Sequence, residues 1–136
     1  IFEILWDLFA EGEHWRIGDH GESSLKTLRS RGYRLAVLSN NDSRLRSVLE
    51  DHSITPLFEE IFISSELGVE KPDPAIFRAV EDKMKEKPDG FLHLGDSYSR
   101  DFMGAQKAGW SALLYGLPII EKSQITSFSE LLDHLP

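Results

Sequence analysis

Four short, nearly continuous apolar segments alternate with longer segments in which apolar residues recur three and four positions apart. The continuous segments lie at 33–38, 61–63, 91–94 and 111–115, and this pattern is typical of strands buried on both faces. The periodic segments between them predict amphipathic helices, which begin near Ser23, Asp42 and Asp73 and after Asp96. Such alternation predicts parallel βαβ units, with helices on both faces of one sheet.

The first 21 residues follow a different pattern. Ile1, Ile4, Leu5, Leu8 and Phe9 fall on one face of a helix, so the spacing predicts a helix over residues 1–9. Residues 10–21 contain three glycines and interrupt the periodicity, which indicates a linker.

Composition narrows the class of protein and its partners. A chain of 136 residues with 40% hydrophobic residues is expected to form one domain with a substantial core. It has no cysteine, which excludes disulfides and thiolate chemistry. A formal charge of -8 argues against nucleic acid or an anionic membrane as a partner. We expect no apolar membrane span, and an intracellular, soluble protein whose compartment the composition does not specify.

Chemically useful side chains follow three of the predicted strands. Ser39 and Asn40 follow the first, a loop reaching Lys71 follows the second, and Asp96 and Asp101 follow the third. Ligands in such sheets bind beyond the carboxyl ends of the strands. A hydroxyl and an amide suit a phosphate group, a lysine supplies positive charge, and carboxylates are ligands that Mg²⁺ prefers.

These segments resemble motifs of a known superfamily. Leu38-Ser-Asn40, Lys71-Pro72 and Gly95-Asp-Ser-Tyr-Ser-Arg-Asp101 are similar, in order and spacing, to motifs II, III and IV of the haloacid dehalogenase (HAD) superfamily. The wider context is most similar to the haloacid dehalogenase-like hydrolase domain-containing type, in which a helical cap is inserted after the first strand. The resemblance covers residues ~15–116.

The resemblance implies a Rossmann-like, three-layer αβα fold and a Mg²⁺-dependent phosphohydrolase that acts through an aspartyl-phosphate. It implies that Lys71 is catalytic, that Ser39, Asn40 and Lys71 bind the phosphate of a small phosphoester, and that Asp96 and Asp101 hold Mg²⁺. It also divides the chain into the end of a cap with its return linker, residues 1–21, and an α/β core, residues 22–136.

One motif of the family does not occur in this sequence. The superfamily's nucleophile is the first aspartate of an Asp-x-Asp at the end of the first core strand, and no two aspartates here are two positions apart. We therefore expect a fragment that lacks the first strand and the nucleophile and is inactive alone. An open strand position would favour association by strand sharing.

Other functions fit parts of this pattern. A non-catalytic binding or regulatory protein on the same fold is the main alternative. A halide-releasing enzyme is disfavoured because it has no need of the two metal-binding aspartates. A phospho-receiver module is disfavoured because its acidic residues precede its serine and lysine. His93, inside an apolar strand, is expected to be a packed core residue.

Overall fold

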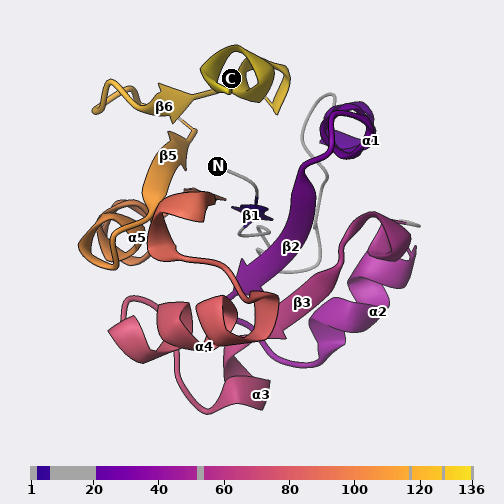
Figure 1. Cartoon of the computed structure of the whole chain (residues 1–136), viewed down its shortest axis with the longest axis vertical. Coiled ribbons are helices and arrows are strands. Elements are labelled where there is room, and N and C mark those ends of the chain that lie inside the picture. Colours follow the sequence, from indigo (N-terminus) through magenta and orange to yellow (C-terminus); the bar gives the residue numbers. More distant parts are fainter. Residues whose placement is uncertain (1–2, 7–20, 52–53, 117, 127, 136) are drawn as a thin grey trace.

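Six parallel strands form a single sheet at the centre of the molecule (Figure 1). A computed structural model describes residues 3–6, 21–51, 54–116, 118–126 and 128–135. The strands lie in the order β3-β2-β1-β4-β5-β6. Their bounds are β1 Glu3–Trp6, β2 Arg34–Ser39, β3 Glu60–Ile63, β4 Phe91–Gly95, β5 Ser111–Tyr115 and β6 Gln124–Ile125. The four strands predicted from the apolar segments are confirmed as β2 to β5.

Helices cover both faces of this sheet, which confirms the three-layer αβα architecture (Figure 1). The apolar residues of α1, α2 and the C-terminal η4 pack on one face, and those of α4, η3 and α5 pack on the other. The helical bounds are α1 Gly21–Ser30, α2 Arg44–Asp51, η1 Thr55–Leu57, α3 Ser64–Leu67, α4 Pro74–Met84, η2 Pro88–Gly90, η3 Tyr98–Met103, α5 Gly104–Lys107 and η4 Phe128–His134.

The central position of the sheet is occupied by β1, which corrects the helix predicted over residues 1–9. Glu3–Trp6 pairs with Arg34–Val37 of β2 on one side and with Phe91–Leu94 of β4 on the other. Ile4 is completely buried. A short apolar run does not distinguish a buried strand from a buried helix by periodicity alone. Pairing with β1 satisfies the backbone N–H and C=O groups of β2 and β4 that face it. Each such group would cost about 1–3 kcal/mol if it were buried without a partner.

The expectation that this chain lacks the first strand of its sheet is therefore wrong. Because β1 fills the position between β2 and β4, no open position remains there to favour strand sharing. The assignment of residues 1–21 to a cap and linker stays a prediction. Residues 3–6 belong to the sheet, and residues 7–20 lie outside the described residues.

Local sequence signals explain several element ends. Asp73 caps α4 by accepting a hydrogen bond from the backbone N–H of Ala75, with Pro74 in the first helical turn. Asp42 accepts a hydrogen bond from the N–H of Arg44 at the start of α2, as expected for a cap. Gly109 ends the helical segment before β5 with a φ of 90°, a value that favours glycine. The two helix starts mark where loops at the carboxyl edge of the sheet end, whereas Gly109 belongs to the connection that enters the amino end of β5.

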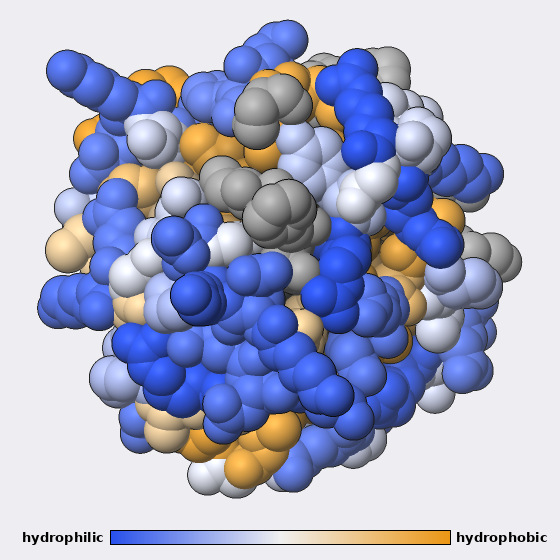
Figure 2. Space-filling view, in the orientation of Figure 1, coloured by the Kyte–Doolittle hydropathy of each residue, from blue (hydrophilic) through white to orange (hydrophobic). Residues whose placement is uncertain are grey.

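One face of the molecule carries mostly polar side chains. Figure 2 shows a mostly hydrophilic face with hydrophobic residues in small, separate groups. Among the described residues, no helix has both the length and the hydropathy needed to cross a bilayer.

Candidate active site

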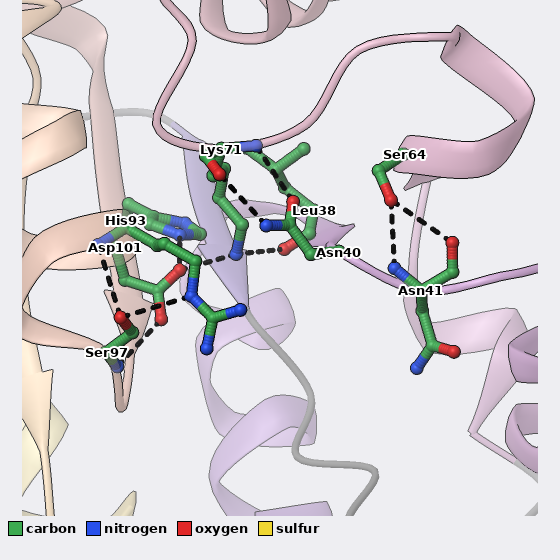
Figure 3. A network of polar contacts seen from close by, with 9 residues as sticks. Leu38, Asn40, Asn41, Ser64, Lys71, His93, Ser97 and Asp101 are labelled. Atoms are coloured by element: carbon green, nitrogen blue, oxygen red, sulfur yellow. Dashed lines mark hydrogen bonds and ion pairs between the residues drawn. The ribbon is translucent and has the colours of Figure 1, made fainter.

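Predicted site residues meet at the carboxyl edge of the sheet, around the ends of β2 and β4 (Figure 3). Lys71, on the loop between α3 and α4, points between the backbone carbonyl of Leu38 in β2 and the carboxylate of Asp101 in η3. The topology accounts for this meeting, because β2 and β4 flank β1 and their carboxyl ends lie at one edge. The structure thus brings together Lys71 and Asp101, which are 30 positions apart in sequence.

The ammonium group of Lys71 is held by a buried ion pair. Its Nζ donates to Asp101 Oδ1 at 2.5 Å and to the Leu38 carbonyl at 3.3 Å. The exposed fraction of the side chain is 0% for Lys71 and 1% for Asp101. Removing two charges from water is costly unless they are paired and hydrogen-bonded. This position of Lys71 therefore depends on its polar neighbours.

Asp101 accepts hydrogen bonds through both carboxylate oxygens. Oδ1 faces Lys71 Nζ and His93 Nε2, the latter at 3.2 Å, while Oδ2 accepts from the Ser97 backbone N–H at 2.9 Å. Gly95 leaves room for this carboxylate, because a Cβ at that position would lie 2.3 Å from Asp101 Cγ. The glycine of the Gly-Asp motif thus has a steric explanation.

The side chain of Asn40 binds the backbone of Lys71. Its Oδ1 accepts from the Lys71 N–H at 2.8 Å, and its Nδ2 donates to the Lys71 carbonyl at 3.0 Å. These two bonds fix the loop that carries Lys71 against the end of β2. Phosphate binding by Asn40 stays a prediction; in the structure its amide positions the lysine.

Ser39 is buried at the last position of β2, beside this clamp. The loop that follows is fixed in turn: Asn41 N–H donates to Ser64 Oγ at 3.0 Å, and that hydroxyl donates to the Asn41 carbonyl at 3.1 Å. The segment from Ser39 to Asn41 is thereby held between the lysine loop and α3. Its predicted contact with phosphate stays a prediction.

Asp96 lies beside this network with an exposed side chain. Its pKa is raised, first because nearby protein atoms displace part of its water and second because of the negative charge of Asp101. Two carboxylates close enough to repel each other suit a cation, and Mg²⁺ commonly takes one or two carboxylates and completes its shell with water. Within the described part of the chain, no group of three or more acidic or histidine side chains forms a candidate metal cluster.

Two residues that hold parts of this network in place were not predicted as site residues. His93 is buried, as expected for a core histidine, but it also contacts Asp101. Ser64 was not singled out, although it fixes the loop after β2. Strand alternation offered a signal for His93, because it lies on the same face of β4 as Gly95. No local pattern marks Ser64, whose partner lies 23 residues away.

Comparisons with known proteins identify the family of this chain. The family model of the haloacid dehalogenase-like hydrolases matches residues 3–109. Haloacid dehalogenase-like hydrolase domain-containing protein 3 of Bos taurus is 36% identical over 118 residues, which are 87% of this chain and 47% of that protein. Glyceraldehyde 3-phosphate phosphatase of Methanothermobacter thermautotrophicus is 36% identical over 100 residues, 73% of this chain and 44% of that protein.

Solved structures share the fold. An uncharacterised protein from Listeria monocytogenes superposes with a TM-score of 0.83 at 20% identity, over 98% of this chain and 96% of its own. A magnesium-bound putative HAD-hydrolase from Bacillus subtilis gives a TM-score of 0.76 at 26% identity, over 85% of this chain and 54% of its own. The chain spans about half the length of the curated relatives it matches. By its sequence and its fold, this chain belongs to the haloacid dehalogenase-like hydrolases.

Proposed function

We propose that this chain supplies the phosphate-binding core of a Mg²⁺-dependent phosphomonoester hydrolase. The observation that carries the proposal is the buried ammonium of Lys71, fixed at the carboxyl edge of the sheet by Asp101 and by the Asn40 clamp. A lysine held in place by protein groups offers a positive charge of fixed position at the edge of the sheet where a phosphate would bind.

Each side chain of the site has a separate role in the proposed function. Lys71 attracts and orients the phosphate, and the Ser39 hydroxyl donates a hydrogen bond to one of its oxygens. Asp101 keeps the lysine in place, and Asp96 is the accessible carboxylate. Asp96 would be the direct ligand of Mg²⁺, which offsets negative charge on a bound phosphoester, and Asp101, whose oxygens already accept hydrogen bonds from the protein, would add its negative charge beside the ion.

The relatives support phosphate chemistry. One relative, 36% identical to this chain, is a glyceraldehyde 3-phosphate phosphatase, and a structural neighbour at 26% identity is a predicted phosphoglycolate phosphatase. Both names describe small phosphomonoesters. We extend to this chain only that chemical class, with a small-molecule substrate and no nucleic acid or membrane partner.

The family's nucleophile motif does not occur in this chain. The sequence has no Asp-x-Asp, so we predict that the chain alone does not turn over phosphoesters. In the sequence, Asp7 directly follows Trp6, the last residue of β1, and it lies outside the described residues. An Asp7→Asn variant therefore tests whether the nucleophile is truly missing.

The test measures turnover and binding separately. We expect no release of phosphate from a generic aryl phosphate above background with Mg²⁺. We also expect inorganic phosphate to shift the backbone amide signals of Ser39, Asn40 and Lys71 in NMR titrations with Mg²⁺. Lys71→Met should abolish these shifts, and the matched control Lys83→Met, on an exposed lysine, should keep them. Wild-type shifts confined to other residues would contradict the proposal, and turnover lost in Asp7→Asn would refute the missing nucleophile.

A non-catalytic binding protein on the same fold is the second candidate. The absence of an Asp-x-Asp favours it. The full-length product of the gene that encodes this chain distinguishes the two functions. Phosphatase turnover that Asp96→Asn abolishes supports the enzyme, whereas phosphate binding without turnover supports the binding protein.

A further inference from the structure

His93 is a buried histidine whose ring is held by aromatic neighbours. It lies in the middle of β4 and is completely buried. The rings of Phe77 and Trp110 meet it edge-on, each with its centroid 6.3 Å from that of the imidazole. Such contacts account for its packing and fix the plane of the ring. They do not explain why a polar ring occupies this position.

The polar contact of the ring is with the carboxylate that holds Lys71. His93 Nε2 lies 3.2 Å from Asp101 Oδ1, the same oxygen that accepts from Lys71 Nζ. A carboxylate oxygen only accepts hydrogen bonds, so this contact requires the imidazole proton on Nε2. With the Ser97 N–H on Oδ2, three donors then converge on one buried carboxylate.

These donors have different degrees of freedom. The Ser97 N–H belongs to the backbone at the start of η3, and the lysine reaches its position at the end of a flexible side chain. The imidazole is rigid and is locked by Phe77 and Trp110. His93 is therefore the side chain that can fix where Oδ1 points, and Oδ1 fixes where the ammonium lies.

We propose that His93 is a positioning residue that orients the Asp101 carboxylate through Nε2–H and thereby holds the Lys71 ammonium in place. The inference uses the proposed function only in regarding Lys71 as the phosphate-binding charge. The contacts and the readouts below involve no phosphate, so they stand or fall independently of that function.

Lysine acetylation followed by mass spectrometry tests the proposal in the full chain. His93→Leu removes the donor and keeps an apolar side chain, whereas His93→Gln keeps an N–H donor at a similar reach. We expect the acetylation rate of Lys71 to rise about tenfold in His93→Leu, the scale of one lost hydrogen bond, and to stay near the wild-type rate in His93→Gln. Lys83, which is exposed, is the internal control and should react equally in all variants.

Two further measurements separate positioning from stability. Leu92→Ala removes buried apolar atoms from the same strand on the opposite face, and it shows how much Lys71 reactivity follows from lost stability alone. A His93→Leu rate no higher than that of wild type or of Leu92→Ala overturns the proposal, as does equal reactivity of His93→Leu and His93→Gln. If His93→Leu does not fold, the imidazole ¹⁵N signals of the wild type decide. A proton on Nε2 supports the proposal, and a proton confined to Nδ1 overturns it.

Discussion

Two ion pairs of nearly equal length lie at opposite ends of the strands in very different surroundings. At the carboxyl end, Lys71 and Asp101 are 2.5 Å apart with side chains 0% and 1% exposed. At the amino end, Arg34 at the start of β2 and Glu59 before β3 are 2.6 Å apart, with side chains 37% and 46% exposed. Distance does not distinguish the two pairs, whereas burial does. If one partner is removed, water can solvate the remaining charge of the exposed pair, but it cannot reach the remaining charge of the buried pair.

Removal of one partner at the carboxyl end should have the largest effect. Lys71→Met leaves the Asp101 carboxylate buried without its cation, and we expect it to lower the free energy of unfolding by about 3–5 kcal/mol. Urea denaturation measures this change. Lys71→Met combined with Asp101→Asn should recover part of the loss, because no unpaired charge then remains. A loss below about 1 kcal/mol for Lys71→Met would show that the pair behaves like a surface pair.

Shortening a buried side chain of the central strand β1 tests the sheet that supports the ion pairs at both ends of its strands. Ile4 is fully buried in β1, so Ile4→Ala should lower the free energy of unfolding by about 2–5 kcal/mol. Leu67→Ala, at a partly exposed leucine, is the control and should cost much less. Hydrogen exchange supplies the second readout: the amides of β1 should be protected together with those of β2 and β4. Fast exchange of the β1 amides in a folded chain would contradict the strand assignment.

Loss of the α4 cap should have an intermediate effect. Asp73→Ala removes the acceptor for the Ala75 N–H at the start of the helix that follows the lysine loop. We expect a loss of about 1 kcal/mol in thermal or urea unfolding. Asp82→Ala, on an exposed residue of the same helix, should change stability by less than about 0.5 kcal/mol. Equal effects of the two variants would argue against the cap.

The exposed pair should give the smallest effect and a defined pH dependence. Arg34 lowers the pKa of Glu59 below its ordinary value, mainly through their hydrogen bonds. A lowered carboxyl pKa stabilises the folded state at pH values above the unfolded pKa, and this stabilisation is lost as pH falls through the folded value. The free energy of unfolding of the wild type should exceed that of Glu59→Gln by less than about 1 kcal/mol at pH 7. This difference should shrink below about pH 4. A difference that grows on acidification would contradict this sign.

The sequence predicted elements better than it predicted how they meet. The buried strands β2 to β5 and the Asp73-Pro74 cap follow from local patterns, because burial on both faces and a missing N–H leave local signals. β1 did not, because its three apolar residues suit a strand or a helix equally and only the neighbours β2 and β4 decide.

The candidate site shows the same limit. Lys71 and Asp101 were identified by motif and spacing, and the structure brings them together. The sequence did not reveal which residues position Lys71. The Asn40 amide binds backbone atoms 31 residues away, and His93 contacts Asp101 across the loop after β4. Hydrogen bonds between distant segments leave no periodicity, so only the fold reveals which side chains position the lysine.

The most direct test of the account is a pair of double-mutant cycles run under identical conditions. One cycle combines Lys71→Met with Asp101→Asn, and the other combines Arg34→Met with Glu59→Gln. We expect a coupling energy of at least about 2 kcal/mol for the buried pair and below about 1 kcal/mol for the exposed pair. Coupling below about 1 kcal/mol in both cycles would contradict the claim that the buried network fixes Lys71 at the carboxyl edge of the sheet.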